Sequence, residues 1–210
     1  KIVVVDDHPL MRQGIIQLLA LEQRFSVVGE ASNGQDALAV VLAQDPDVVL
    51  MDLNMKGMDG IESLKLLREH DVDAKIIMFT VSDENDDVIN ALRNGADGYL
   101  LKDMEPEELL DRLRTAISGQ MVLSPDLMHI LASELRNDPK APKATDVGDL
   151  TKREKEILKQ IAAGSSNKQI ARKFEITEGT VKVHVKNLLK KMNLRSRVEA
   201  AVWAVENKLR

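Results

Sequence analysis

The sequence predicts an α/β domain with a doubly wound, five-stranded parallel sheet, followed by a small all-α domain of four helices. Three observations support this prediction. Through the first 120 residues, short apolar runs rich in β-branched residues alternate with segments of helical period. Beyond residue 150 the strand signal disappears. The charge changes sign there too: residues 1–150 carry 14 Lys and Arg against 28 Asp and Glu, a net −14, whereas residues 151–210 carry 15 against 6, a net +9.

Five apolar runs predict the strands, because buried parallel strands read as nearly continuous hydrophobic segments. They are Ile2–Asp6, Phe25–Ala31, Asp47–Asp52, Lys75–Thr80 and Gly98–Lys102. The helices predicted between and after them are Pro9–Glu22, Gly34–Gln44, Gly60–His70, Asn85–Asn94 and Pro106–Ser118. Successive β–α units need right-handed crossovers, which place helices on both faces of an open sheet. Residues 1–120 therefore fit a flavodoxin-like doubly wound fold.

The rest of the chain divides into a linker and a helical module. Residues 121–149 are assigned to the linker: a helix is predicted at Ser124–Glu134, and prolines with small or charged residues then predict a flexible segment. Residues 150–210 form the helical module, and Thr151 with Glu154 has the spacing of a capping box at its start. The helices expected in it are Lys152–Ala163, Asn167–Phe174, Glu178–Met192 and Arg197–Lys208.

Composition narrows the class of protein. The chain has no cysteine, which excludes disulfides and Cys-ligated zinc or iron–sulfur sites. No apolar run approaches the roughly 18 residues of a membrane span, and no basic-then-apolar signal opens the chain. We therefore expect a cytoplasmic protein without a membrane partner. The sequence begins at Lys1 rather than at an initiator methionine, which is compatible with a missing short leader.

Polar residues stand at the ends of four predicted strands: Asp6 and Asp7, Asp52, Thr80, and Lys102. Because ligands of open parallel sheets bind beyond the carboxyl ends of the strands, these side chains are expected to lie together. Three carboxylates repel one another unless a cation joins them, and an all-oxygen set suits Mg²⁺. The Thr80 hydroxyl and the Lys102 ammonium would suit a phosphoryl group on that metal. Singly, each residue also has a structural explanation as a turn former, a helix cap or a surface charge.

The segments Val-Val-Val-Asp-Asp-His-Pro (3–9), Met-Asp-Leu-Asn-Met (51–55) and Tyr-Leu-Leu-Lys (99–102) resemble the receiver domain of bacterial two-component response regulators. The resemblance implies that Asp52 is the phospho-accepting aspartate. It also implies that Mg²⁺ is held by Asp6, Asp7, Asp52 and the backbone carbonyl of Asn54. Many receivers have proline where this chain has Lys56, which leaves the rigidity of that loop open.

The same resemblance assigns the remaining pocket residues. Thr80 and Tyr99 match the switch pair of the family, and Lys102 matches its invariant lysine. The implied reaction is in-line phosphoryl transfer from a phosphohistidine of a sensor histidine kinase to the Asp52 carboxylate. None of the four histidines forms a donor pattern, and His8 reads as a solvated residue at a helix start. We therefore expect a phosphoryl acceptor with slow self-hydrolysis rather than a turnover enzyme.

The basic module contains two predicted helices, Asn167–Phe174 and Glu178–Met192, joined by a short turn, which indicates a helix-turn-helix. Lys182 and Lys186 are four residues apart, so they project from one side of the second helix, which also carries Lys190. Val183 is placed to touch a thymine methyl group. Aromatic residues make up only 2% of the chain, so duplex DNA is favoured over single strands or RNA.

Residues 150–158, 166–171 and 180–188 resemble the LuxR-type DNA-binding domain. The resemblance implies that Lys182, Val183 and Lys186 enter the major groove. Phosphate contacts are implied for Ser166, Asn167, Lys168 and Thr180. The last helix looks like the dimer contact of the family, although packing within the domain explains its apolar residues equally well. The candidate dimer contacts are Val198, Ala201 and Val202.

Together the two domains resemble the NarL-type response regulators, with the nitrate/nitrite branch nearest. The expected protein is a transcription regulator in which phosphorylation frees the DNA-binding domain and promotes dimeric binding to promoter DNA. The acidic first domain is a natural electrostatic mask for the basic second one. Two alternatives stay open. One is a Mg²⁺-dependent phosphatase with an aspartyl nucleophile, which Asn54 disfavours because such enzymes need a second acid there. The other is a constitutive DNA-binding protein with a structural receiver.

Overall fold

The computed structural model describes residues 1–118, 122–123, 125–137 and 144–209. The chain divides into two compact units, Lys1–Ser118 and Gly119–Arg210, which are described separately. Among the described helices, none combines the length and the apolar character needed to cross a bilayer.

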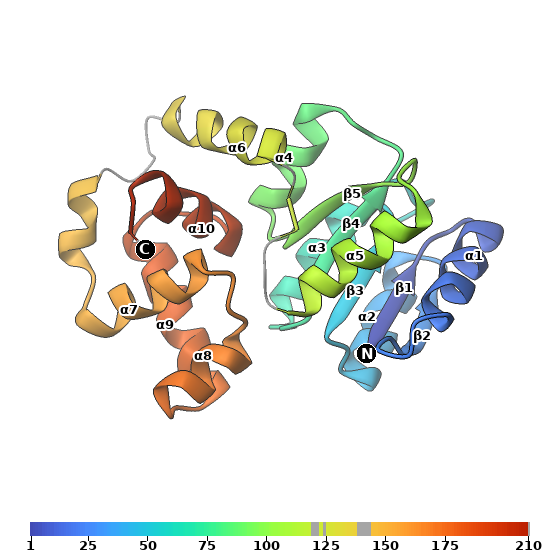
Figure 1. Cartoon of the computed structure of the whole chain (residues 1–210), viewed down its shortest axis with the longest axis horizontal. Coiled ribbons are helices and arrows are strands. Elements are labelled where there is room, and N and C mark those ends of the chain that lie inside the picture. Colours follow the sequence, from blue (N-terminus) through green and yellow to red (C-terminus); the bar gives the residue numbers. More distant parts are fainter. Residues whose placement is uncertain (119–121, 124, 138–143, 210) are drawn as a thin grey trace. The chain divides into compact units, whose positions relative to one another are not determined.

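The first unit is built on a parallel sheet of five strands (Figure 1). The strands are β1 (Ile2–Val5), β2 (Val27–Ala31), β3 (Val48–Met51), β4 (Lys75–Thr80) and β5 (Gly98–Leu101). Their order in space is β2-β1-β3-β4-β5, so the direction of winding reverses between β1 and β3. Such a reversal opens a crevice at the carboxyl ends of the two strands, and this is where doubly wound sheets bind ligands.

Five helices cover the sheet on both faces (Figure 1). They are α1 (Pro9–Ala20), α2 (Gly34–Gln44), α3 (Gly60–Glu69), α4 (Asn85–Arg93) and α5 (Pro106–Ile117). The helices α2, α3 and α4 are successive neighbours on one face. On the other face, Arg114 of α5 donates a hydrogen bond to Glu22, just after α1. The strands β1 and β3 are completely buried between these layers, which explains their wholly apolar sequences.

Every strand and helix predicted in this unit is present, but several end earlier than predicted. The strands β1, β3 and β5 stop one residue before Asp6, Asp52 and Lys102. The backbone N–H of each of these polar residues still donates to the last residue of a neighbouring strand, so all three stand at the carboxyl edge of the sheet.

The second unit consists of α6 (Pro125–Asn137), the 3₁₀ helix η1 (Ala144–Asp149), α7 (Lys152–Ala162), α8 (Asn167–Phe174), α9 (Glu178–Lys191) and α10 (Arg197–Glu206). The predicted capping box of Thr151 and Glu154 opens α7. The helix expected within the linker corresponds to α6, which packs against α10 and clusters with the helical module. Part of the expected flexible segment, residues 144–149, instead forms η1, and residues 138–143 lie outside the described part of the chain.

Candidate functional site

An acidic cluster lies at the reversal point of the sheet. Asp6 and Asp52 directly follow β1 and β3, which pair in parallel register through their last residues. Both side chains are buried, and Asp7 beside them is half-buried. One ligand atom from each of these aspartates and one from His8 lie within 4.8 Å of one another. The structure thus brings together the three carboxylates that the sequence placed at this edge.

Lys102 joins two of these carboxylates. Its Nζ atom lies 2.8 Å from Oδ2 of Asp6 and 2.9 Å from Oδ2 of Asp52, and its side chain is only 6% exposed. Burial raises the pKa of Asp52 above its ordinary value; the hydrogen bond and charge of Lys102 oppose this rise, and the charge of Asp6 adds to it. One ammonium therefore compensates only part of the negative charge of the cluster.

The cluster fits a hard divalent cation. Asp7 Oδ1 is buried and accepts no hydrogen bond from the described residues. His8 Nδ1 lies 2.8 Å from this oxygen, but the approach lacks hydrogen-bond alignment, and the imidazole is 71% exposed. A buried carboxylate oxygen without a donor is costly unless a cation occupies the space beside it. The oxygen-rich donor set is the type that Mg²⁺ prefers. The approach of His8 to Asp7 was not predicted from the sequence.

The loop after β3 turns two backbone amides toward the acidic cluster. Asn54 N donates to Asp52 Oδ1 over 3.4 Å, and Lys56 N donates to Asp7 Oδ2 over 3.2 Å. The second bond depends on Lys56, because a proline at this position has no N–H to donate. The departure from the receiver pattern at position 56 therefore adds a donor to one of the acids.

The two residues of the expected switch pair meet at Ser82, which sequence reasoning did not single out. Tyr99 is buried and donates from its hydroxyl to the backbone carbonyl of Ser82 over 2.9 Å. Thr80 is also buried, and its Oγ1 accepts from Ser82 N over 3.2 Å. Burial raises the pKa of Tyr99 to about 12, partly opposed by the hydrogen bond to Ser82. Both side chains thus fix the start of the loop between β4 and α4.

Gly60 is a further residue of the site that sequence reasoning missed. A Cβ atom at this position would lie 2.3 Å from the Asp52 carbonyl oxygen and 2.7 Å from Leu53 Cα. Its backbone N also donates to Leu53 O over 2.8 Å. Only glycine allows the first turn of α3 to approach the acidic cluster this closely. A glycine that starts a helix eight residues after a candidate nucleophile is the signal that would have found it.

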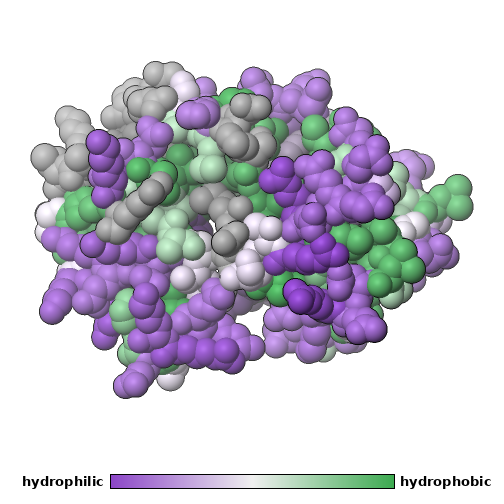
Figure 2. Space-filling view, in the orientation of Figure 1, coloured by the Kyte–Doolittle hydropathy of each residue, from purple (hydrophilic) through white to green (hydrophobic). Residues whose placement is uncertain are grey.

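The second unit presents basic side chains on its helix-turn-helix, formed by α8 and α9. Lys186 and Lys190 of α9 are exposed, Lys182 is half-exposed, and Val183 between them is 59% exposed. Figure 2 shows hydrophilic side chains over the part of this unit where α8 and α9 lie. An exposed apolar residue among lysines at the start of a helix suits contact with base edges in a groove, as predicted for Val183.

The residues expected to contact phosphates cluster at two helix starts. Ser166 caps α8 by accepting from Gln169 N, and Lys168 is exposed in the first turn. Asn167 Oδ1 accepts from Arg197 Nη1 over 2.9 Å, which ties α10 to α8. The Thr180 hydroxyl lies 2.9 Å from that of Thr177, the residue that caps α9. Of the two helix starts, that of α8 carries the positive charge of Lys168, which favours an anion contact, whereas the first turn of α9 carries Glu178.

The last turn of α9 is tied to the start of α7. Lys191 Nζ lies 2.7 Å from Oε2 of Glu154, and the same oxygen accepts from Thr151 N over 2.7 Å. Burial by itself raises the pKa of Glu154, but the hydrogen bonds from Lys191 and Thr151 outweigh it and lower the pKa below the ordinary value. Lys191 therefore ties α9 to α7, although the residue is itself exposed.

The candidate dimer contacts are buried within the second unit. Val198, Ala201 and Val202 of α10 are exposed by only 4%, 3% and 2%. Their helix packs against α6, α7 and α9. The side chains thus serve the core of this unit in the described conformation.

Two protein families match the chain. Residues 2–114 match the response regulator receiver domain, and residues 149–204 match the bacterial regulatory proteins of the luxR family. The acidic cluster lies in the first match, and α7 to α9 lie in the second.

Relatives match over nearly the full length. The nitrate/nitrite response regulator protein NarL of Escherichia coli (strain K12) is 52% identical over 208 residues, covering 99% of this chain and 96% of the relative. The nitrate/nitrite response regulator protein NarP of the same strain is 45% identical, covering 99% and 95%. Among solved structures, the response regulator ChrA of a heme-sensing two-component system is similar at a TM-score of 0.52 and 31% identity, covering 100% of this chain and 98% of that one.

Proposed function

Because this chain belongs to the response regulators that join a receiver domain to a luxR-family DNA-binding domain, we propose that Asp52 receives the phosphoryl group that controls its binding to DNA. Members of this family are transcription regulators whose DNA binding depends on phosphorylation, and they are not turnover enzymes. This assignment sets the phosphatase alternative aside. The observation that carries the proposal is the burial of Asp52 beside Asp6 and Lys102 at the reversal point of the sheet.

The residues around Asp52 have distinct roles in the proposed transfer. A carboxylate oxygen of Asp52 attacks the phosphorus, the new O–P bond forms in line, and the bond from phosphorus to the histidine of a sensor kinase breaks. Asp6, Asp7, Asp52 and the carbonyl of Asn54 would hold Mg²⁺. When bound, the metal neutralises charge on the transferring group. Lys102 is placed to compensate the charge on the transferred group, because its ammonium already bridges two of the acids.

The switch pair, Thr80 and Tyr99, would transmit the effect of phosphorylation from Asp52 to the loop between β4 and α4. We infer that the Thr80 hydroxyl, now an acceptor from Ser82 N, turns to donate to the new phosphoryl oxygens. This would release one of the two bonds that fix Ser82, and Tyr99, which holds the other, would follow. The loop between β4 and α4 is then the element whose equilibrium phosphorylation shifts.

At the DNA, we propose that Lys182, Val183, Lys186 and Lys190 of α9 face the major groove of duplex promoter DNA. The phosphate contacts proposed beside them are Ser166, Asn167, Lys168 and Thr180. The exposure of Val183 among these lysines supports this arrangement. The net charges of the two halves of the chain, −14 and +9, support a gating role for the receiver.

We also propose that the protein forms a homodimer on phosphorylation or on DNA, and that it works in the cytoplasm, where its kinase and promoters are accessible. A dimer contact through Val198, Ala201 and Val202 would require their present packing to open, because all three are buried. Sedimentation of the full chain with and without acetyl phosphate and Mg²⁺ measures the dimer directly. A monomer under both conditions, and on DNA, would reject it.

The full-length similarity to NarL and NarP supports control by a nitrate- or nitrite-responsive sensor kinase. The test is phosphoryl transfer from such a kinase to this chain, compared with transfer from a kinase of unrelated signal. Equal rates from both kinases would argue against the nitrate/nitrite branch.

The central experiment measures DNA affinity of the full chain with and without acetyl phosphate and Mg²⁺, at one fixed salt concentration. Asp52→Asn is the matched variant, since it keeps the size of the side chain and removes the nucleophile. Affinity should rise for the natural chain alone. If both proteins bind equally well under both conditions, the constitutive DNA-binding alternative replaces the switch.

A second experiment tests the groove contacts. Lys186→Gln should weaken binding to every sequence and lower the slope of log affinity against log salt by about 1 if the residue meets a phosphate, or reduce discrimination by about 1–3 kcal/mol if it meets a base. Lys65→Gln is the matched control, because it removes an exposed lysine from α3 of the receiver.

A further inference from the structure

A half-buried arginine connects the acidic cluster to the edge of the sheet. Arg12 lies in α1, with a side chain that is 14% exposed. Its Nη1 atom donates to the backbone carbonyl of Asp6 over 2.6 Å, and its Nε atom donates to Glu30 Oε2 of β2 over 2.8 Å. The same glutamate oxygen accepts from Gln13 Nε2 over 3.0 Å. One guanidinium thus spans β1, β2 and α1 at the point where the metal-binding acids begin.

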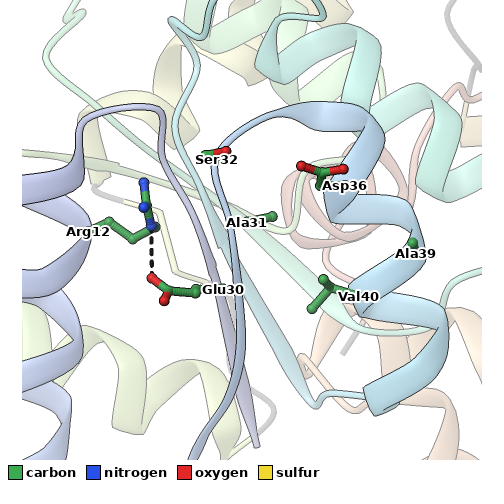
Figure 3. A pocket seen from close by; sticks show the side chains of 7 residues that line it. All are labelled: Arg12, Glu30, Ala31, Ser32, Asp36, Ala39 and Val40. Atoms are coloured by element: carbon green, nitrogen blue, oxygen red, sulfur yellow. Dashed lines mark hydrogen bonds and ion pairs between the residues drawn. The ribbon is translucent and has the colours of Figure 1, made fainter.

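Figure 3 shows this pair from the side of a hollow of about 380 Å³, which is open to solvent. Arg12 and Glu30 point toward each other on one side, and Ser32, Asp36 and Val40 lie on the others. The hollow leaves the ion pair reachable by water. The planar fork of arginine presents separate N–H donors, Nη1 to the Asp6 carbonyl and Nε to Glu30, whereas a lysine would have to reach both acceptors from a single nitrogen.

We propose that Arg12 is a positioning residue for the magnesium site, and that it acts through the Asp6 carbonyl rather than through its charge. That carbonyl lies just past the β1 ladder, so Arg12 supplies the donor that holds the chain where it turns into α1. Asp6 Oδ1 and Asp7 are placed by the same short turn, in which His8 N donates to Asp6 Oδ1 over 2.8 Å. Loss of the guanidinium would free this turn and misplace both acids.

The direction in which Mg²⁺ affinity changes when Arg12 is removed distinguishes a positioning role of this residue from an electrostatic one. A positive charge near the acids opposes the binding of a cation, so removal of the Arg12 charge would by Coulomb's law alone tighten Mg²⁺ binding. If Arg12 holds the acids in place, its removal instead weakens Mg²⁺ binding. Outer-shell partners of metal ligands typically contribute about 10-fold to 100-fold in affinity.

The experiment is calorimetric titration of Mg²⁺ into the full chain, which needs no phosphoryl donor. Arg12→Gln should bind Mg²⁺ about 10-fold to 100-fold more weakly than the natural chain. Arg12→Lys should be similarly weak, because it keeps the charge and loses the fork. Arg112→Gln is the matched control: it removes one exposed arginine of α5, paired with Glu108, and should leave the affinity unchanged. Circular dichroism checks that each variant is folded. If Arg12→Gln does not fold, the Mg²⁺ affinity of Arg12→Lys decides whether Arg12 has a positioning role.

The inference rests on the proposed magnesium site, and the outcomes keep the two apart. Equal or tighter binding by Arg12→Gln, or full affinity in Arg12→Lys, overturns the positioning role and leaves the site standing. If the natural chain binds no Mg²⁺, or if Asp7→Asn binds it as well as the natural chain, the proposed site falls and the role of Arg12 falls with it.

Discussion

Lys102 Nζ lies 2.9 Å from Asp52 Oδ2, and this contact joins the ends of two strands that are not neighbours in the sheet. The strand β4 lies between β3 and β5, so the long lysine side chain must cross it to reach the acids. Because both side chains are buried, the ammonium is the principal compensation for the charge of Asp52 among the described residues.

Replacement of Lys102 should make the stability of the receiver depend on Mg²⁺. We expect Lys102→Ala to lower the free energy of unfolding of the receiver by about 3 kcal/mol in the presence of a chelator, because two buried carboxylates lose their shared cation. The loss should shrink when Mg²⁺ is added, since the metal supplies the missing charge. Chemical unfolding followed by far-ultraviolet circular dichroism measures both values. Lys65→Ala, at an exposed lysine, is the control. A loss of equal size with and without Mg²⁺ would contradict this account.

The close approach of α3 to Asp52 should make Gly60 intolerant of a side chain. Gly60→Ala places a Cβ atom 2.3 Å from the Asp52 carbonyl oxygen, so the backbone must shift. We expect a stability loss of about 1–3 kcal/mol from overpacking. The misplaced nucleophile should also slow labelling by acetyl phosphate by about 10-fold to 100-fold.

Gly14→Ala is the matched control for this change. A Cβ atom at Gly14 meets nothing within 4 Å, and the residue lies inside α1. Alanine there should stabilise the helix by up to about 1 kcal/mol and leave labelling unchanged. Unimpaired labelling of Gly60→Ala would show that the start of α3 does not fix Asp52.

Tyr99 is the only tyrosine of the chain, so its ionisation can be followed by tyrosinate absorbance. Burial raises its pKa to about 12, whereas a solvated tyrosine titrates near about 10. Between these values the folded protein keeps a proton that the unfolded chain loses. The free energy of unfolding therefore falls by about 1.4 kcal/mol per pH unit in this interval, and the contribution is fully present below about pH 10.

At pH values near 10, we expect the urea-unfolded chain to be half ionised at Tyr99 and the native chain to show little tyrosinate. A native titration that coincides with the unfolded one would mean that the phenol is open to solvent. Tyr99→Phe, which removes the titrating group, gives the baseline.

Glu154 should contribute to the stability of the second unit in a pH-dependent way. The hydrogen bonds from Lys191 and Thr151 lower its pKa in the folded state. The contribution is therefore complete above the unfolded pKa of about 4.3 and is lost as the pH falls through the lower folded value. Glu154→Gln should cost about 1 kcal/mol at neutral pH, since the capping box and the ion pair both weaken. The difference from the natural chain should narrow below about pH 4.

Trp203, the only tryptophan, lies buried in α10 and reports the unfolding of this unit by fluorescence. Glu156→Gln is the control for Glu154→Gln. It removes another acid of α7, and the partner of this acid, Arg153, is itself partly exposed. A cost that stays constant from neutral pH down to pH values near 3 would exclude the ionised form of Glu154 as its source.

Local patterns determined the elements of this protein and the order of its domains. The alternation of apolar runs with amphipathic segments predicted every strand of the receiver, because buried parallel strands leave a continuous apolar signature. The position of Asp52 after a wholly apolar strand placed it at the edge of the sheet, and the charge reversal near residue 150 marked the basic module. These features depend on neighbours in the chain and on the fixed periods of helix and strand.

Other features were decided only by tertiary structure, because they depend on pairs of residues far apart in the chain. The sequence could not show that Arg12 reaches Asp6 O while held by Glu30, or that Gly60 must lack a side chain to clear Asp52. Nor could it show that Lys191, among the several lysines of α9, binds Glu154 of α7. Sequence period determines which face a residue occupies, but the partner on that face is set by how the helices and strands pack.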